Sequence, residues 1–199
     1  ALMGGFPEIK TFGNRLKVLL KDSPYDIVLD NQSLSYGILQ VQNNIPVIEI
    51  VHHPITKDYK YDILFSKGII QKLSKWRWFS FLRMQKKVAP QINVISTPSL
   101  NSKNDIEKDF NVIRENIFVI PNGIDHIKFS PKKHIERIPG QLITTASADV
   151  PLKGLDFTLQ AISQLKKDYP AIRLIVIGAP RPGGHTERLI QKLNIEANI

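Results

Sequence analysis

Apolar residues along the chain fall into two patterns, helical spacing and short continuous runs. Helical spacing predicts a helix that begins near Ile9 and passes through Leu20, and further helices at 34–42, 104–110 and 155–165. Continuous runs followed by polar residues predict strands at 25–30, 45–51, 94–96, 117–120, 142–146 and 174–177. Strands and helices therefore alternate, which favours an α/β fold with parallel sheets.

The stretch 142–184 is the clearest example of this alternation. It reads as strand, polar loop, helix, strand and a loop rich in glycine and proline. Such a βαβ unit has parallel strands, and ligands bind at their carboxyl ends. Lys153 stands just before the helix start, where its charge and the free backbone N–H groups suit a phosphate or diphosphate. Gly154 either lets the backbone approach that phosphate or is an ordinary glycine at a helix start.

The amino-acid composition favours a negatively charged binding partner but does not say which one. The formal net charge is +9, which favours anionic partners, and the absence of cysteine excludes disulfides and thiolate metal sites. The sequence contains neither a secretory signal peptide nor an apolar run long enough to span a bilayer, so we expect a cytoplasmic protein. Because the chain starts at Ala1 and ends at Ile199 on the approach to another strand, we expect both ends to be cut from a longer protein.

Six segments of the sequence resemble one enzyme family. They read TTASADVPLKGLD, VIGAPRPGGHTERLIQKL, DIVLDNQSLSYGIL, VIEIVHHPITKD, ISTPSLNSKNDIEKDFNV and FVIPNGIDHIKFSP. Together they resemble the retaining GT-B glycosyltransferases of group 1, or family 4. The resemblance implies two Rossmann-like units, each incomplete here. These are the second part of an acceptor-side domain (1–125), a linker (126–141) and the first part of a nucleotide-sugar-binding domain (142–199).

The resemblance also implies an activity. Members transfer a sugar from a UDP- or GDP-sugar to a hydroxyl of a lipid or polysaccharide acceptor with retention, in processes such as cell-envelope polysaccharide biosynthesis. No metal or cofactor is expected. In the family, the lysine that matches Lys153 binds the donor diphosphate. An arginine is usual six residues earlier, where this chain has Ser147, and Arg181 is a candidate substitute. The loop that starts at Gly178 either passes beside the nucleotide or is a flexible connection.

Two further motifs are candidate sites. His52 and His53 follow a strand, and a histidine at this place in the family contacts the transferred sugar or the acceptor. We favour His52 and expect the other histidine to be structural, while a metal site is a third interpretation that no carboxylate pattern supports. Asn122 and Gly123 predict a turn near the interdomain crossing, with a positive φ at the glycine and a mainly structural role.

The segment 66–87 mixes basic and aromatic residues, including Trp76, Arg77 and Trp78. It is interpreted as a helix with aromatic side chains in the core and solvated lysines, as a contact with an anionic membrane surface, or as a nucleic-acid contact. Nucleic acid is the least favoured, because no nucleic-acid-binding motif accompanies the segment. Peripheral attachment to the inner face of the membrane follows from the second interpretation.

Two family motifs are not found where the resemblance requires them. The glycine-rich loop is expected before Ala1 and the Glu-x7-Glu pair beyond Ile199, while the spacing of Glu107 and Glu115 is read as coincidence. We therefore expect no sugar transfer by the 199-residue chain alone. Two alternatives stay open. One is a non-catalytic basic module that binds membrane or nucleic acid. The other is a different GT-B enzyme, such as a sugar-nucleotide epimerase or a phosphorylase.

Overall fold

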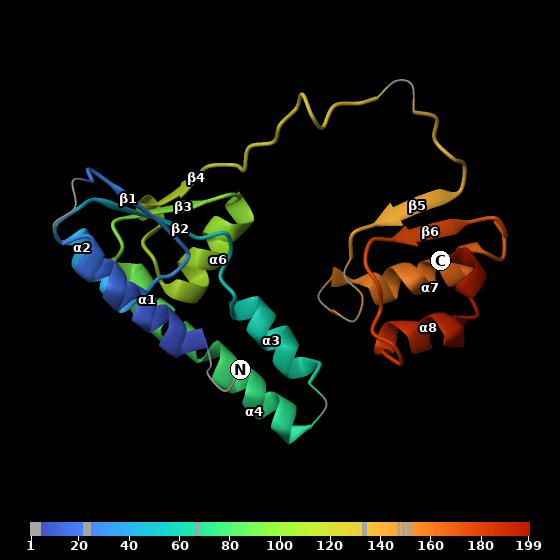
Figure 1. Ribbon diagram of the computed structural model, residues 1–199, viewed down its shortest axis with the longest axis horizontal. Coiled ribbons are helices and arrows are strands. Elements are labelled where there is room, and N and C mark those ends of the chain that lie inside the picture. Colours follow the sequence, from blue (N-terminus) through green and yellow to red (C-terminus); the bar gives the residue numbers. More distant parts are fainter. Residues whose placement is uncertain are drawn as a thin grey trace. The chain divides into compact units, whose positions relative to one another are not determined.

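The computed structural model describes residues 5–21, 25–66, 68–132, 135–146, 148, 150 and 153–199. Contacts divide the chain into two compact units, Ala1–Ile124 and Asp125–Ile199. The division falls one residue before the predicted start of the linker at 126. Each unit is an α/β structure around a parallel sheet (Figure 1).

The first unit is a four-stranded parallel sheet with helical connections. Its strands pair in the order β1-β2-β3-β4. Its elements are α1 (Gly5–Leu19), β1 (Val28–Asn31), α2 (Tyr36–Gln42), β2 (Val47–Ile50), α3 (Thr56–Leu64), α4 (Ile69–Trp78), η1 (Phe79–Phe81), α5 (Leu82–Val88), η2 (Ala89–Gln91), β3 (Val94–Thr97), α6 (Leu100–Phe110), η3 (Arg114–Asn116) and β4 (Ile117–Val119). The predicted strands are therefore all present, most of them shorter than the apolar runs that indicate them.

One face of this sheet is buried and the other is partly open. Val47, Ile95 and Ile117 point into the core and are at most 3% exposed. On the opposite face, Leu29 and Phe118 are 63% and 51% exposed. Strands in sequential order with right-handed crossovers place their connections on one face, and Figure 1 shows α1, α2 and α6 below the sheet.

Helices α1 and α2 cross at two glycines. A Cβ atom on Gly37 would lie 2.0 Å from the carbonyl oxygen of Gly13, and one on Gly13 would lie 2.1 Å from the Ser35 hydroxyl. At distances below 3.0 Å something must shift, and for Gly37 the close atoms are backbone atoms of Gly13. The two backbones therefore touch directly, and this contact fixes α1 against the helix that leads into β2.

Helix α6 starts earlier than the sequence predicts. The apolar spacing predicts a start at Asn104, but the helix begins at Leu100. Ser99 is the N-cap, and its hydroxyl accepts a hydrogen bond from the Ser102 backbone N–H at 3.1 Å. The capping hydrogen bond explains the difference, because it stabilises a first turn that has little apolar periodicity.

The segment 66–87 is not one continuous helix. It forms α4, the short η1 turn and α5. Phe79 and Phe81 are both buried, although residues two apart point to different sides of an α-helix. The tighter turn between the helices lets both rings enter the core, so aromatic burial divides the predicted helix in two.

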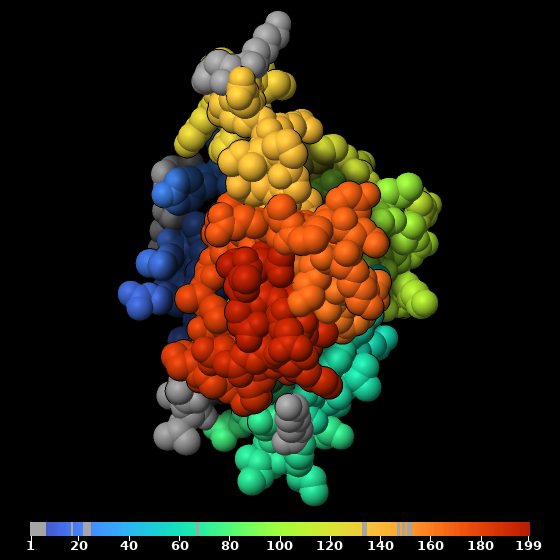
Figure 2. All heavy atoms as spheres, turned by 90° about the vertical axis from the view of Figure 1, so that its right-hand side faces the viewer, coloured from blue at the N-terminus to red at the C-terminus, as the bar shows by residue number. Residues whose placement is uncertain are grey.

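The second unit contains a parallel βαβ unit. It is built from β5 (Gln141–Thr144), α7 (Leu155–Leu165), β6 (Arg173–Val176), α8 (His185–Leu193) and η5 (Glu196–Asn198). Strands β5 and β6 pair in register from Gln141 with Arg173 to Thr144 with Val176. Leu159, Ile162 and Ile195 are almost fully buried between the helices and the sheet. Figure 2 shows one face of this unit, with the C-terminal residues in dark red at its middle.

Candidate functional site

Polar residues gather at the carboxyl edge of the first sheet. β1 ends at Asn31, β2 is followed by His52 and His53, and β3 ends at Thr97. Parallel strands place these ends at one edge, which is where α/β proteins bind ligands. Both predicted histidines therefore lie at the expected edge, and both are exposed.

Gln32 holds the backbone around both histidines. Its side-chain oxygen accepts a hydrogen bond from the His52 backbone N–H at 3.0 Å, and its Nε2 donates to the His53 carbonyl oxygen at 2.9 Å. Gln32 itself has a left-handed backbone, with φ of 63°. The loop after β1 therefore fixes the loop after β2 through one amide.

The two imidazoles have different partners. His52 Nε2 lies 2.9 Å from the side-chain oxygen of Asn31, and His53 Nε2 lies 3.0 Å from the carboxylate of Asp58. Asp58 is in the first turn of α3, where a negative charge is favourable. His53 is thus tied to the helix that follows it, whereas His52 lies over the neighbouring strand end. The preference for His52 as the residue that faces a substrate stays a prediction.

A buried carboxyl pair lies inside the sheet next to this edge. Asp30 of β1 and Glu49 of β2 are register partners, and they are 5% and 0% exposed. Asp30 accepts hydrogen bonds from the backbone N–H and the hydroxyl of Ser33, and Glu49 Oε1 accepts one from the Leu34 backbone N–H at 3.2 Å. Burial, followed by the adjacent Asp30 carboxylate, raises the pKa of Glu49 from 4.5 to about 10. Glu49 is therefore a neutral acid, and its otherwise unpartnered Oε2 can donate to Asp30.

Sequence reasoning missed the residues that organise this edge. Asn31, Gln32 and Asp58 are ordinary loop and helix-start residues, and only the strand register reveals their partners. Glu49 did carry a signal, because it is the one charged residue in the apolar run 45–51. An acid inside a run that predicts a buried strand indicates a group that is paired, neutral or both.

In the second unit, Lys153 lies just before α7, as predicted. Gly154 is the N-cap of this helix, with a left-handed φ of 72° that favours glycine. The Lys153 side chain is exposed, and its ammonium group makes no hydrogen bond or ion pair with any residue that the structure describes. A cation without an internal partner beside a helix N-terminus can bind an anion. Ser147 lies outside the described residues.

The loop after β6 lies next to the start of α7. His185, the first residue of α8, places its Nε2 2.7 Å from the carboxylate of Asp156 in the first turn of α7. Gly178 has a φ of 116°, and Arg181 is exposed and accepts a hydrogen bond from the Gly184 N–H at 2.7 Å through its carbonyl. The His185–Asp156 contact thus joins the two loops that the sequence predicts to bind the donor.

A cavity of about 290 Å³ opens between these loops and helices. Gly178 and Pro180 of the second loop line it, together with Leu155 at the start of α7 and Thr186 of α8. Most of its surface is apolar, so it suits a flat ring rather than a phosphate. The exposed Lys153 is outside this lining, at the preceding turn.

The predicted turn at Asn122 and Gly123 is wrong. Gly123 has no positive φ, and residues 121–125 form no turn, helix or strand. The turn begins at Asp125 instead, whose carboxylate accepts hydrogen bonds from the backbone N–H groups of Ile127 and Lys128 at 3.0 and 2.9 Å. A side chain that bonds its own backbone two and three residues onward defines the turn, and this chemistry outweighs the Asn-Gly signal.

The basic aromatic segment divides its aromatic residues between core and surface. Phe79 and Phe81 are buried, whereas Trp76 and Trp78 are each 48% exposed. The Arg83 guanidinium lies over the Trp76 ring, 5.2 Å from its centroid. The interpretation as a core helix is therefore correct for the phenylalanines and wrong for the tryptophans.

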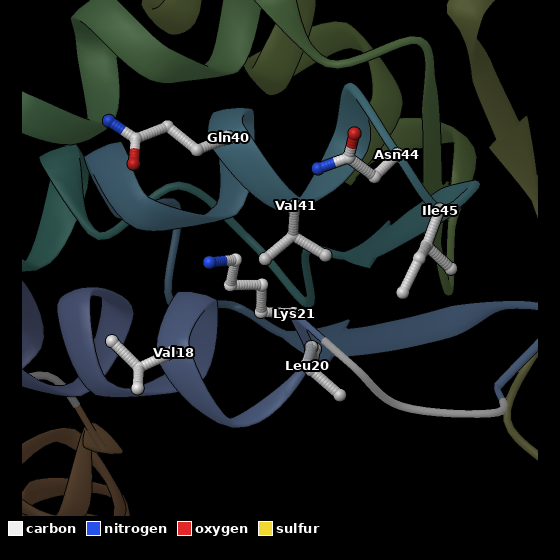
Figure 3. A pocket seen from close by; sticks show the side chains of 7 residues that line it. All are labelled: Val18, Leu20, Lys21, Gln40, Val41, Asn44 and Ile45. Atoms are coloured by element: carbon white, nitrogen blue, oxygen red, sulfur yellow. The ribbon is translucent and has the colours of Figure 1, made fainter.

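A further cavity of about 390 Å³ lies at the opposite edge of the first sheet (Figure 3). It lies between the ends of α1 and α2, where Val18, Val41 and Ile45 line it together with Lys21, Gln40, Asn44 and Leu20. Ile45 precedes β2, so this cavity is at the amino ends of the strands. It is thus separate from the histidines.

Among the described residues, no group of three or more histidine and acidic side chains is placed to hold a metal ion. No helix among them combines the length and the apolar character needed to cross a bilayer.

Comparison with known proteins gives matches to glycosyltransferases. Residues 2–128 match the family model described as Glycosyltransferase Family 4. The MMP alpha-(1->4)-mannosyltransferase of Mycolicibacterium hassiacum is 39% identical over 194 residues, which cover 96% of this chain and 46% of that protein. Two crystal structures of TarM, one from S. aureus in complex with fondaparinux, alpha-GlcNAc-glycerol and UDP, each align with a TM-score of 0.55. Their identities are 18% and 17%, and each alignment covers 92% of this chain and 34% or 33% of theirs.

The parallel sheets with helical connections match the α/β fold of the GT-B glycosyltransferases, and the TarM alignments support this fold. The chain belongs to glycosyltransferase family 4, because the family model covers more than half of it. It spans about half the length of its curated relative.

Proposed function

We propose that the protein transfers a hexose from a UDP- or GDP-sugar to a hydroxyl of a glycan or lipid acceptor with retention and without a bound metal. The relative named as a mannosyltransferase supports the hexose, and the complex of TarM with UDP supports a nucleotide donor. The observation that carries the proposal is the exposed Lys153 ammonium at the start of α7, which has no partner among the residues that the structure describes. Its charge would stabilise the diphosphate as the bond to the sugar breaks.

The remaining predicted residues have complementary roles in this proposal. The main-chain N–H groups at the start of α7 would bind diphosphate oxygens beside Lys153. Gly178 and Arg181 would border the nucleoside, and the apolar cavity beside them would hold its flat base. His52 would contact the transferred sugar or the acceptor. The acceptor oxygen would form its bond to the sugar on the face from which the diphosphate leaves.

Nucleotide binding by the 199-residue chain tests the donor half of the proposal. We expect UDP or GDP to bind, and Lys153→Ala to weaken the affinity by about 10- to 100-fold, the cost of losing one charge-assisted contact. The control is Lys167→Ala, which removes the same charge from an exposed position in the same unit. Isothermal titration calorimetry gives both dissociation constants. Equal affinities in the two variants would remove Lys153 from the site.

A peripheral membrane contact is a second candidate, favoured by the tip between α3 and α4. Ile69 and Ile70 are 84% and 86% exposed there, beside the exposed Leu64, Phe65 and Leu73 and several lysines. Apolar side chains with a basic rim suit an anionic bilayer surface. We expect co-sedimentation with phosphatidylglycerol vesicles that is lost in an Ile69→Glu, Ile70→Glu variant. Ile127→Glu, exposed in the other unit, should leave sedimentation unchanged.

A further inference from the structure

A cavity on the first unit is separate from both the histidines and the donor loops. It has a volume of about 290 Å³ and lies between α3 and the η1–α5 segment. The residues that line it are Thr56, Tyr59, Lys60, Trp76, Phe79, Ser80, Leu82, Arg83 and Lys86. Three of them are cations and none is a carboxylate. The volume is near the lower end of the range for ligand pockets, about 300–1,000 Å³, and suits a single sugar ring.

Aromatic rings form one part of this cavity. The rings of Tyr59 and Phe79 pack with their centroids 5.3 Å apart, and Phe79 is buried. Trp76 is half exposed, and the Arg83 guanidinium lies over its ring, 5.2 Å from the centroid. Aromatic surfaces give a flat apolar wall for the C–H face of a sugar. A cation–π contact also favours this position of the guanidinium, whose N–H groups can donate to an anion.

The cations of this cavity differ from their neighbours in how they are paired. Lys57 and Lys75 bond to Asp105 and Asp62 at 2.5 and 2.6 Å. Lys60 and Lys86 are exposed and have no ion-pair partner among the described residues.

Two acids on the elements around the cavity contact other residues. Asp58 bonds to His53, and Asp109 accepts a hydrogen bond from the Thr56 hydroxyl. Among the residues that the structure describes, no ion pair is formed by Lys60, Arg83 or Lys86 of the cavity.

We propose that this cavity binds an anionic saccharide unit, one that carries a phosphate or a carboxylate on a sugar ring. Arg83 and Lys86 would bind the anion, and the aromatic wall would contact the ring. If the proposed transferase function is correct, this site recognises an acidic residue of the acceptor glycan. The binding itself does not depend on that function.

Intrinsic fluorescence offers a direct test, because the chain has two tryptophans and Trp76 alone lines the cavity. In a Trp78→Phe background, glucose 6-phosphate should change Trp76 emission in a saturable manner. Glucose and inorganic phosphate, tested separately, should bind at least about 10-fold more weakly, because each offers half of the contacts. Lys86→Ala should weaken glucose 6-phosphate binding by about 10-fold or more. Lys87→Ala, the adjacent exposed residue outside the lining, should not.

Several results would overturn this inference. They are equal binding of glucose and glucose 6-phosphate, equal losses in the two lysine variants, or an emission change with phosphatidylglycerol vesicles but not with the sugar phosphate. Failure here with intact UDP or GDP binding would reject the cavity and leave the proposed function standing. Sugar-phosphate binding without nucleotide binding would support the cavity site and reject the proposed function.

Discussion

The imidazole Nε2 of His185 lies 2.7 Å from the Asp156 carboxylate, and this contact joins the first turns of α7 and α8. Both side chains are partly exposed, at 51% and 35%, so the pair adds little to stability once solvent screening is considered. The contact instead fixes positions, because it holds the loop that contains Arg181 next to the turn that contains Lys153. If the proposed function is correct, the loops that bind the donor would thus be aligned by residues that need not touch it.

Asp156→Asn should therefore affect binding more than folding. We expect the free energy of unfolding to change by less than about 1 kcal/mol, as for other exposed ion pairs. The affinity for UDP or GDP should fall several-fold. Asp168→Asn is the control, because it removes the same charge from an exposed position near the end of α7. Calorimetric titration and urea unfolding of both variants separate the two effects. A large loss of stability without a loss of affinity would contradict the positioning role.

Glu49 should make stability depend on pH in an unusual direction. Its pKa is raised to about 10, so the folded protein binds a proton that the unfolded chain releases near 4.5. The stabilisation is complete below pH 4.5 and is lost as the pH rises towards 10, with a limiting slope of about 1.4 kcal/mol per pH unit. Glu49→Gln keeps a neutral group that can still accept from Leu34 and donate to Asp30. Urea unfolding at pH 5, 7 and 9 should show a smaller decline for this variant, whereas parallel curves would refute the buried neutral acid.

The crossing of α1 and α2 should tolerate no side chain. Gly37→Ala would place a Cβ 2.0 Å from the Gly13 carbonyl oxygen, and the helices would have to separate. We expect a loss of about 1–3 kcal/mol, the usual range for overpacking. Gly123→Ala is the matched control, since nothing lies within 4 Å of its Cβ position and its φ is not positive. Thermal unfolding of both variants measures the difference, and similar midpoints would argue against the close contact.

The two histidines should respond differently to substitution. In the active transferase, His52→Ala should lower kcat/KM by about 10- to 100-fold, because a hydrogen bond to the sugar or acceptor would be lost. His53→Ala should have the smaller effect on transfer and cost at most about 1 kcal/mol of stability through loss of its Asp58 contact. Steady-state kinetics with a nucleotide sugar, together with unfolding curves, measures both. The reverse order of effects on kcat/KM would assign the substrate contact to His53.

Much of the architecture follows from local sequence, because the apolar runs and helical spacings act over short distances. The runs at 45–51 and 174–177 predict β2 and β6, and the polar residues that follow them predict where His52 and Gly178 lie. Features that depend on partners distant in sequence do not follow. The bonds from Gln32 to the histidine loop and the Asp30–Glu49 pair arise from the strand register, which the sequence does not display.

Predictions from local sequence are wrong in two segments, where two sequence signals favour different structures. At 121–125 the Asn-Gly pair predicts a turn, but the Asp125 carboxylate forms one further on. Within 66–87 no residue type marks the end of a helix. The helix is divided where Phe79 and Phe81 are both buried. In both segments the residue types alone do not decide the structure. The hydrogen bonds that Asp125 makes and the burial of the two phenylalanines depend on how the neighbouring residues are placed.

The amide of Gln32 has a consequence for how the loop with the two histidines can move. Because it binds the N–H of His52 and the C=O of His53 at once, the two peptides that flank this pair cannot flip without breaking one of these hydrogen bonds. Movement is then confined to the peptide between the two histidines and to their side-chain torsions. If the proposed transferase function is correct, these few torsions would set which acceptors fit, and an acceptor too large for all of them would be refused rather than accommodated.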